Sequence, residues 1–537
     1  MVLSLSMALG APLIRAAETS AIPVTDDPDA KAQAISAYNS GLEAVRKGDW
    51  ENAAGNFEKA VGLDSKDTSS FMFLGYVRLK QEKFDAALAA LQSAEKLMPA
   101  GDTQGKATLY NNLGLVFWSK NQPADAITAY QKALQFDKKA SDAQYNLAFA
   151  LLSQKRYADA TPQLEALAKT STDPAMQGTI YDALGEAYEN QKDLGKALGA
   201  YKKAIELRPK EPSYPLHMAL ALINSNRKND AVSYLIKVTE LDPQSTDPQN
   251  AEAFLQLGAI HIERRKWSEA QDVLKRYVAL RPADALGWFN LGVAYDYTGT
   301  AFNDALDAYG KAQKLDAKNA AIYNNVGRIH FKRGKNEEAI AALQKALELD
   351  GQSSDARHNL AIVYADQARS LDKDKKLDEA KAKFAAADTE WRTLLKNIED
   401  PWRKETDPDR KAALASLVVG AHAGLAEIAL TQKQYTSAIF EYERLLDAMP
   451  DNVVAKINLG LAFYHSKQWV KAEAVYRDIT AKDKTNAVAF NNLGAVLEAQ
   501  GNKTGALDAY REAVRLKADY VEAINNLKRL QQATKVG

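Results

Sequence analysis

The sequence predicts an all-α protein built of stacked helical hairpins, and three observations lead to this fold class. Short phrases recur, with YNNLGLVFW at residues 110–118 returning as FNNLGAVLE at residues 490–498. The spacing between such phrases is mostly 34 residues, and the apolar residues inside them follow the period of a helix. Polar turns and prolines separate the helical segments. The chain is therefore expected to be a repeat array with a continuous core.

The composition is typical of a chain that folds in water. The 537 residues are 46% hydrophobic and 26% charged, and 69 basic residues balance 69 acidic ones. A chain without net charge has no overall field that attracts nucleic acid, so nucleic acid is not an expected partner. The chain has no cysteine, which excludes disulfides, thiolate metal sites and cysteine nucleophiles.

The first residues resemble a secretory signal. Met1 to Ile14 is an apolar run that is too short to span a bilayer, and no Lys or Arg precedes it. Two interpretations are open. Residues 1–29 are either the signal segment of an exported, periplasmic or cell-envelope protein, or an apolar tail, with a cytoplasmic location as the alternative. No integral membrane segment is expected.

Thirteen repeats align on one small residue, which we call the anchor. Seven of the twelve intervals between successive anchors are 34 residues, and most of the others are 35 to 39. The anchors are Gly41, Gly75, Gly114, Ala148, Gly185, Ala219, Gly258, Gly292, Gly327, Ala361, Ala426, Gly460 and Gly494.

Each repeat keeps the same residue types at fixed distances from its anchor. An aromatic residue often lies four before it, and an alanine lies twelve after it in eleven of the thirteen repeats. An aromatic residue or leucine follows at sixteen, and proline closes several repeats. These positions form one apolar stripe on each of two helices, and the small anchor allows a close approach between them. One hairpin cannot bury this face alone, so the hairpins must stack.

This pattern resembles the tetratricopeptide repeat. The family motif of an aromatic residue, Leu-Gly, a second aromatic, Ala-x-x-x-Phe and a closing Pro is matched by YDALGEAY at residues 181–188, followed by Ala197, Tyr201 and Pro209. The resemblance covers about residues 30–518. It implies a right-handed superhelical solenoid whose first helices line a concave groove.

Departures from the repeat period predict the domain limits. The largest is the gap of 65 residues between Ala361 and Ala426, and we expect the main architectural break there. The predicted domains are a repeat array of about ten repeats at 30–396, a polar connector at 397–412, an array of about three repeats at 413–518, and a capping helix with a tail at 519–537.

A recurring asparagine lies two residues before most anchors. A rotation of about 100° per residue places this position about 150° from the packing stripe, so it faces out of its hairpin. A carboxamide donates and accepts, which suits the backbone of an extended peptide. The arrangement is similar to the asparagine ladder in the tetratricopeptide domain of O-GlcNAc transferase. The predicted peptide-binding asparagines are Asn39, Asn112, Asn146, Asn290, Asn325, Asn359, Asn458 and Asn492, with Asn526 in the cap.

Aromatic and charged residues on the same stripe complete the predicted groove. Aromatic side chains supply affinity in peptide capture, while amides fix the backbone. The alternative is that the asparagines bond a neighbouring helix or turn and that the aromatic residues pack against the next repeat. The residues of this second group are Phe73, Tyr76, Phe149, Tyr297 and Arg328.

The sequence does not predict an enzyme. Its six histidines lie in different repeats, and neither a metal-binding His pair nor a phosphate-binding loop is present. No catalytic residue, metal site or cofactor is expected. The first hypothesis is a non-catalytic scaffold that binds an extended peptide or partner protein in the concave groove. The alternative is a structural protein that oligomerises or polymerises within a cell-envelope complex through its convex face and ends. A third hypothesis is an accessory domain for an enzyme on another chain.

Overall fold

The computed structural model describes residues 27–535, which form helices joined by short turns, without a strand in that range. These residues divide into two compact units, of which the first ends at Ile260 and the second begins at His261. The predicted all-α fold of stacked helical hairpins is confirmed. The predicted signal or tail at 1–29 lies outside the described residues up to residue 26, while Pro28 and Asp29 belong to the first helix.

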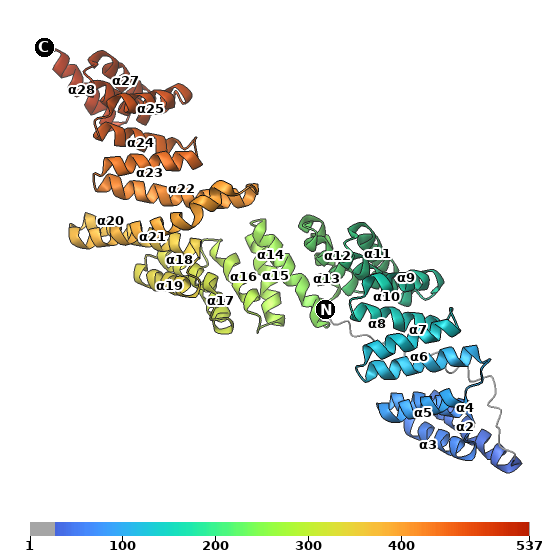
Figure 1. Cartoon of the computed structure of the whole chain (residues 1–537). Helices are drawn as coiled ribbons and strands as arrows, with labels where there is room; N and C mark the ends of the chain where they lie inside the picture. Colours follow the sequence, from blue (N-terminus) through green and yellow to red (C-terminus); the bar gives the residue numbers. More distant parts are fainter. Residues whose placement is uncertain (1–26, 536–537) are drawn as a thin grey trace. The chain divides into compact units, whose positions relative to one another are not determined.

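Helices of the first unit pair in chain order, each even-numbered helix with the next one (Figure 1). The boundary with the second unit falls inside α14 (Ala251–Glu263). The other helices of this unit are α2 (Pro28–Lys47), α3 (Trp50–Leu63), α4 (Thr68–Lys80), α5 (Phe84–Leu97), α6 (Thr103–Ser119), α7 (Pro123–Phe136), α8 (Ser141–Ser153), α9 (Tyr157–Thr170), α10 (Pro174–Asn190), α11 (Leu194–Leu207), α12 (Ser213–Asn224), α13 (Lys228–Leu241) and the short η1 (Pro248–Asn250).

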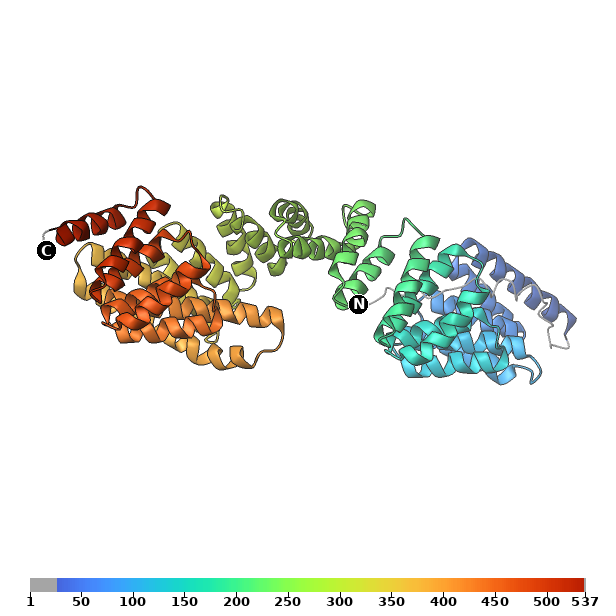
Figure 2. The same cartoon turned by 90° about the horizontal axis from the view of Figure 1, so that it is seen from above.

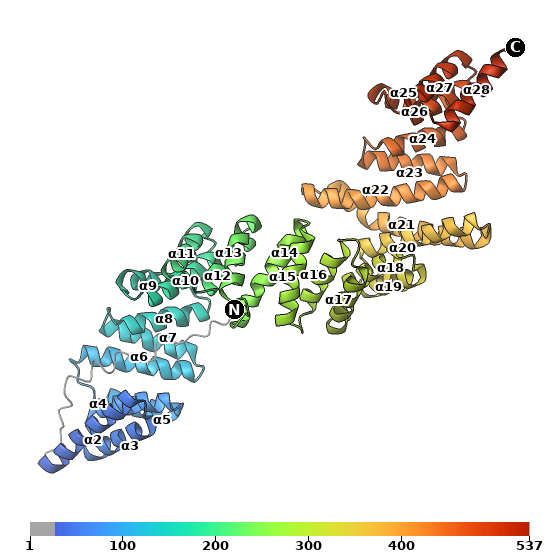
Figure 3. The same ribbon diagram turned by 180° about the vertical axis from the view of Figure 1, so that it is seen from behind.

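The second unit continues the pattern with pairs that begin at α16, and two views show its helices stacked one pair after another (Figures 2 and 3). Its helices are α15 (Trp267–Leu280), α16 (Ala285–Asp296), α17 (Phe302–Leu315), α18 (Ala320–Lys332), α19 (Asn336–Leu349), α20 (Ser354–Lys373), α21 (Leu377–Lys404), α22 (Pro408–Thr431), α23 (Tyr435–Ala448), α24 (Val453–His465), α25 (Trp469–Lys482), α26 (Ala487–Ala499), α27 (Lys503–Leu516) and α28 (Val521–Lys535).

The turns between helices are built by local capping. The Asp49 carboxylate accepts a hydrogen bond of 3.1 Å from the Asn52 amide at the start of α3, and Asp102 accepts one of 2.7 Å from Gly105 at the start of α6. Gly48 ends α2 in the left-handed conformation, with φ of 72°, and its amide bonds back to carbonyls of the last turn. Such caps satisfy the backbone groups that helix ends leave free.

The core of each hairpin lies where the anchor meets the second helix. A Cβ atom on Gly494 would lie 2.6 Å from Tyr510 Cε1, and one on Gly292 would lie 2.6 Å from Tyr309 Cε1. Both tyrosines are almost completely buried. The anchor must therefore be small because an aromatic ring from the second helix packs directly on it.

The predicted polar connector at 397–412 differs from the structure. Residues 397–404 continue α21, and α22 begins at Pro408, so only three residues separate the two helices. The buried residues Trp391, Ile398 and Trp402 form one stripe along α21 at helical spacing. This apolar stripe keeps the segment helical despite its charged outer residues.

The predicted position of the main break also differs, because α20, α21, α22 and α23 pack in sequence and the compact units divide at Ile260 instead. The described chain ends in α28, which contacts α26 and α27. Its Ala523 and Leu530 are buried.

Candidate functional site

First helices of neighbouring repeats lie side by side within each unit. In the first unit α4 contacts α6, α6 contacts α8, and α10 contacts α12, while α18, α20 and α22 do the same in the second. The residue two before an anchor on one helix therefore faces the preceding first helix. The helical projection of a single hairpin does not include this preceding helix. For that reason it predicted that the asparagines face out of the hairpin.

Four side-chain pairs repeat the same contact between neighbouring first helices. In each pair, the residue two before an anchor bonds the residue three before the preceding anchor, which lies 35 positions earlier. Asn146 Nδ2 donates to Asn111 Oδ1 at 2.9 Å, and both side chains are buried. The other pairs are Asn359 with Asn324 at 2.9 Å, Asn526 with Asn491 at 3.1 Å, and His217 with Asp182 at 2.8 Å.

Two further asparagines bond a tyrosine of the preceding hairpin. Asn325 Nδ2 donates to Tyr309 Oη at 3.2 Å, and Asn492 Nδ2 donates to Tyr476 Oη at 3.4 Å. Asn290 and Asn458 are half-buried, and Asn39 is exposed. The structure thus corrects the outward orientation expected for Asn146, Asn325, Asn359, Asn492 and Asn526, whose amide groups link neighbouring repeats.

The predicted aromatic residues fall into two groups. Phe73 and Phe149 belong to the core, with exposures of 3% and 2%. Phe73 stacks on Phe57 at 5.4 Å between ring centroids. These two residues therefore follow the alternative interpretation, in which the aromatic residues pack between repeats.

Tyr297 and Arg328 come together in the second unit. The Arg328 guanidinium lies 4.9 Å from the Tyr297 ring centroid and donates from Nη1 to Tyr297 Oη at 3.0 Å. Arg328 also forms an ion pair with Asp296, which is fully buried. Tyr297 remains half-exposed and stacks on Trp267 at 4.9 Å. Arg328 thus already bonds two protein groups, and Asp296 is shared with Lys332, whose Nζ lies 3.0 Å from Asp296 Oδ1.

A cavity of about 180 Å³ in the first unit brings two predicted residues, Tyr76 and Asn112, together. Tyr76 comes from α4 and Asn112 from α6, and the α7–α8 turn supplies the remaining wall. We call it the Asn112 cavity. Its lining residues are Tyr76, Gln104, Ala107, Thr108, Asn111, Asn112, Leu115, Asp137, Lys139, Ala140, Ser141, Asp142 and Ala143.

Asn112 is the unusual residue of this cavity. Its side chain is 2% exposed, and its Nδ2 atom has no hydrogen-bond partner among residues 27–535. Its neighbour Asn111 is buried as well but accepts the bond from Asn146. Gln104, Lys139 and Ser141 are exposed and form the rim. The lining of the cavity therefore combines a buried side-chain amide with exposed polar residues.

Charged groups line one side of the Asn112 cavity. Asp142 is half-buried in the first turn of α8, and burial raises the pKa of its carboxyl group. Asp137 Oδ1 accepts a hydrogen bond of 2.8 Å from the Lys139 amide. The Lys139 side chain is exposed, and no ion pair joins it to Asp142 in the described part of the chain.

Sequence reasoning missed Asp142, Asp137 and Gln104 as residues of this site. Asp142 lies six before its anchor Ala148, which is a position on the same outward stripe as Asn112. This position in the repeat could have identified Asp142 from the sequence. The wall formed by Asp137 could not be expected, because it comes from a turn outside the helical stripe.

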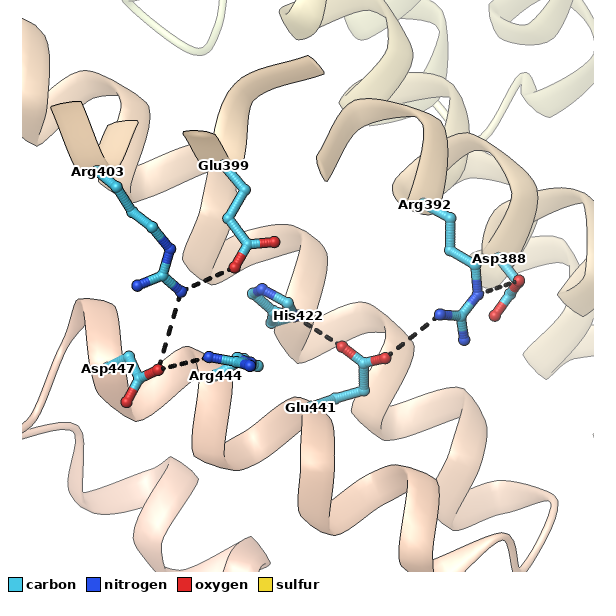
Figure 4. Close-up of polar contacts among 8 residues, drawn as sticks. All are labelled: Asp388, Arg392, Glu399, Arg403, His422, Glu441, Arg444 and Asp447. Carbon is cyan, nitrogen blue, oxygen red and sulfur yellow. Dashed lines mark hydrogen bonds and ion pairs between the residues drawn. The ribbon is translucent and has the colours of Figure 1, made fainter. Parts of the chain in front are cut away.

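A second polar cluster lies in α21, α22 and α23 (Figure 4). His422 Nδ1 lies 2.6 Å from Glu441 Oε2, and both side chains are buried. The other Glu441 oxygen lies 3.5 Å from Arg392 Nη1, and Arg392 Nε donates to Asp388 at 2.8 Å. This cluster adjoins a cavity of about 350 Å³ lined by Arg392 and Glu441 among others.

Further along the same helices, Arg403 of α21 pairs with Glu399 at 2.9 Å and lies 3.9 Å from Asp447 of α23, which Arg444 also contacts at 3.2 Å (Figure 4). Glu441 and Asp447 both have cationic or histidine partners from the protein. The cluster connects the lengthened helix α21 to α22 and α23, and it resembles a structural network more than a binding site.

Two further findings concern metals and membranes. Between residues 27 and 535, no group of three or more His, Asp or Glu side chains is placed to hold a metal ion. In the same range α22 alone is long and apolar enough to cross a membrane, although its Val418, Leu425 and Ile428 are buried in the second unit. Core helices of soluble proteins pass the same test, so this is weak evidence for a membrane span.

Models of the tetratricopeptide repeat match most of the chain. The matching segments are residues 67–139, 117–180, 178–211, 216–285, 255–300, 327–367, 429–497 and 487–518.

Curated proteins resemble the chain over part of their own length. Protein O-mannosyl-transferase TMTC3 of Homo sapiens is 22% identical over 80% of this chain and 40% of its own length. The peroxisomal targeting signal receptor of Candida albicans is 24% identical over 44% of this chain and 36% of its own. The chain thus spans less than half the length of these relatives.

Among solved structures, YrrB, described as a TPR protein with an unusual peptide-binding site, is 19% identical. It covers 42% of this chain and 99% of its own, with a TM-score of 0.33.

Proposed function

Because the chain belongs to the tetratricopeptide repeat family, we propose that it is a non-catalytic interaction scaffold that binds an extended peptide segment of a partner protein at the Asn112 cavity. Tetratricopeptide arrays present long surfaces of stacked hairpins, which suit extended partners. The name of the Candida albicans relative, a receptor for a targeting signal, agrees with recognition of a peptide.

One observation carries the proposal, namely the buried Nδ2 donor of Asn112 without a partner. A buried polar group without a hydrogen bond costs about 1–3 kcal/mol. Most other asparagines at this repeat position are bonded to a neighbouring helix, as Asn146 and Asn359 are. A peptide carbonyl placed in the cavity would accept from Asn112 and remove this cost.

The size of the cavity fits one side chain of a peptide. Its volume of about 180 Å³ equals the space of about six water molecules at about 30 Å³ each. The residues before and after that side chain would lie along α4, α6 and α8, whose outward positions form the surface around the mouth. An extended segment therefore fits better than a folded domain at this point.

The test compares an asparagine of the cavity with an asparagine that joins repeats. Full-length protein selects binders from a display library of random 12-residue peptides, and the affinity of enriched peptides is measured by fluorescence polarisation. We expect Asn112→Leu to weaken binding at least about fivefold, because one hydrogen bond worth about 1 kcal/mol is lost. The melting temperature should not fall, because Asn112 Nδ2 has no partner among residues 27–535 and its replacement removes an unsatisfied buried donor.

The matched control is Asn359→Leu, which removes the bond to Asn324 in the second unit. This variant should melt at a lower temperature and keep its peptide affinity. Enrichment of no peptide above background, or unchanged affinity of Asn112→Leu, would overturn the proposal. Self-assembly, the alternative function, predicts instead that light scattering rises with protein concentration in both variants.

Export is proposed on sequence grounds alone. The apolar run of residues 1–14 is the basis, and it lies outside the described residues. Sequencing the N-terminus of natively produced protein tests it, since a terminus that begins at Met1 contradicts cleavage.

A further inference from the structure

We infer that the Asn112 cavity selects a basic residue, Lys or Arg, of the bound peptide, with Asp142 as the group that recognises the cation. This inference rests on the proposed peptide binding and names the class of side chain that enters. It follows from the charge of the cavity, from the partial burial of Asp142 and from the apolar lining residues Tyr76 and Leu115.

The charge of the lining favours a cationic occupant. Two carboxylates, Asp137 and Asp142, face a single ammonium group on the exposed Lys139. Asp137 is engaged by the Lys139 backbone amide. Among residues 27–535, Asp142 has no hydrogen bond or ion pair to another side chain. The cavity therefore holds one carboxylate more than it holds cations, and the free carboxylate is Asp142.

Because Asp142 is half-buried, its ionised form is favoured by a positively charged partner. Asp142 is half-buried, and the loss of water around it raises the pKa of its carboxyl group above the ordinary value. Asp142 lies in the first turn of α8, where the helix dipole favours a negative charge. An ammonium or guanidinium group beside Asp142 would compensate the charge, while a second carboxylate would be repelled.

The rest of the cavity suits the other parts of a basic residue. Tyr76 and Leu115 offer an apolar wall, against which the methylene groups of a long basic side chain can pack. Asn112 Nδ2 is a donor and so can bond a carbonyl but cannot bond an ammonium group. A Lys or Arg residue brings both requirements, since its side chain supplies the cation and its backbone supplies a carbonyl.

The experiment measures two quantities separately, the capture of peptides and the preference for an amino acid at each peptide position. The full-length protein and its variants select from the same random 12-residue display library, and the enrichment of each amino acid is counted at the best-conserved position of the selected peptides. For the unaltered protein we expect Lys plus Arg to be enriched at least about fivefold at one position. Asp142→Asn should remove this preference while peptides are still captured, and Asp142→Lys should shift it toward Asp and Glu.

Asp125→Asn is the matched control. Asp125 also lies in the first turn of a helix, α7, but it is exposed and does not line the cavity. Asp125→Asn changes the net charge and the charge of a first helical turn as Asp142→Asn does. Because Asp125 does not line the cavity, this variant should keep the preference for Lys and Arg. Melting temperatures of both Asp variants show whether either substitution unfolds the protein.

The outcomes distinguish this inference from the proposed function. If the unaltered protein enriches no peptide, peptide binding itself fails. If peptides are enriched and Asn112→Leu weakens them, but no position prefers Lys or Arg, the basic class is overturned while peptide binding stands. Equal loss of the preference in Asp125→Asn and Asp142→Asn would also overturn it, because the effect would then come from overall charge.

Discussion

At the scale of single residues, identical asparagines have different energetic roles because their neighbours differ. Asn112 and Asn146 both lie two before an anchor and both are buried. Asn146 bonds Asn111 of the preceding repeat, whereas the Nδ2 of Asn112 bonds nothing in the part of the chain that the structure describes. The first residue contributes to stability, and the second is available to a ligand.

Replacement of Asn146 by alanine should destabilise the first unit by about 1–3 kcal/mol. The substitution leaves Asn111 Oδ1 buried without its donor, and this cost is typical for an unsatisfied buried group. Hydrogen exchange of the backbone amides in α6 and α8 measures the change in the local opening free energy. A stability equal to that of the unaltered protein would contradict the role of this bond. The double variant with Asn111→Ala should recover part of the loss, since no unpaired acceptor then remains.

The repeat positions could be predicted from the sequence because packing within a hairpin depends on residues close together in the chain. Anchors such as Gly494, and the rings that pack on them, follow directly from the period. Bonds between Asn111 and Asn146 could not be predicted, since they depend on how one hairpin is placed on the next. The site was predicted in part for the same reason: Tyr76 and Asn112 lie on the stripe, but Asp137 lies on a turn.

At the scale of helices, the first helices α10 and α12 are joined by a contact between a histidine and a carboxylate. His217 of α12 replaces the usual asparagine, and its Nδ1 lies 2.8 Å from Asp182 of α10. Burial acts to lower the pKa of His217, but Asp182, Glu186 and Glu189 outweigh it and raise the pKa above the ordinary value. The contact between α10 and α12 is therefore strongest when the imidazole is protonated.

The stability of the first unit should therefore depend on pH through His217. A raised folded-state pKa stabilises the fold fully below the unfolded value of about 6.5, and this contribution is lost as pH rises through the folded pKa. Melting temperatures between about pH 5 and pH 9 should fall more in the unaltered protein than in His217→Gln. Glutamine can bond Asp182 without a charge. Parallel curves for the two proteins would contradict the prediction.

The lengthened helix α21 shows why the sequence pattern alone did not predict its C-terminal part. Its polar residues near 397–404 predicted a connector, yet Ile398 and Trp402 are buried on the stripe that begins at Trp391. In a chain of charged residues, widely spaced apolar positions are weak signals. These apolar residues stabilise the helix only when neighbouring helices cover them. In the second unit α21 packs against α22, which in turn packs against α23.

At the scale of the whole molecule, each repeat contacts mainly its neighbours, so stability is a local property. A weak hairpin opens without unfolding distant ones, and a single unfolding free energy does not describe such an array. Changes in one unit should therefore leave the other unaffected.

Hydrogen exchange of the Gly494→Ala variant tests this locality. The added Cβ would lie 2.6 Å from Tyr510, and overpacking of this kind typically costs about 1–3 kcal/mol. We expect faster exchange in α24–α28 and unchanged exchange in α4–α8. Gly310→Ala is the control, because a Cβ on that helical glycine meets nothing within 4 Å and alanine favours a helix. Faster exchange throughout the chain would contradict a local response.

The bonds that join successive first helices also limit how the array can be rearranged. Each bond needs an acceptor three before one anchor and a donor two before the next, as in Asn324 with Asn359 and Asn491 with Asn526. Deleting or transposing a hairpin would bring unmatched residues together, so the repeats are not interchangeable modules. Their order is itself encoded, and a segment grafted into another array would need its neighbour's asparagine as well as its own.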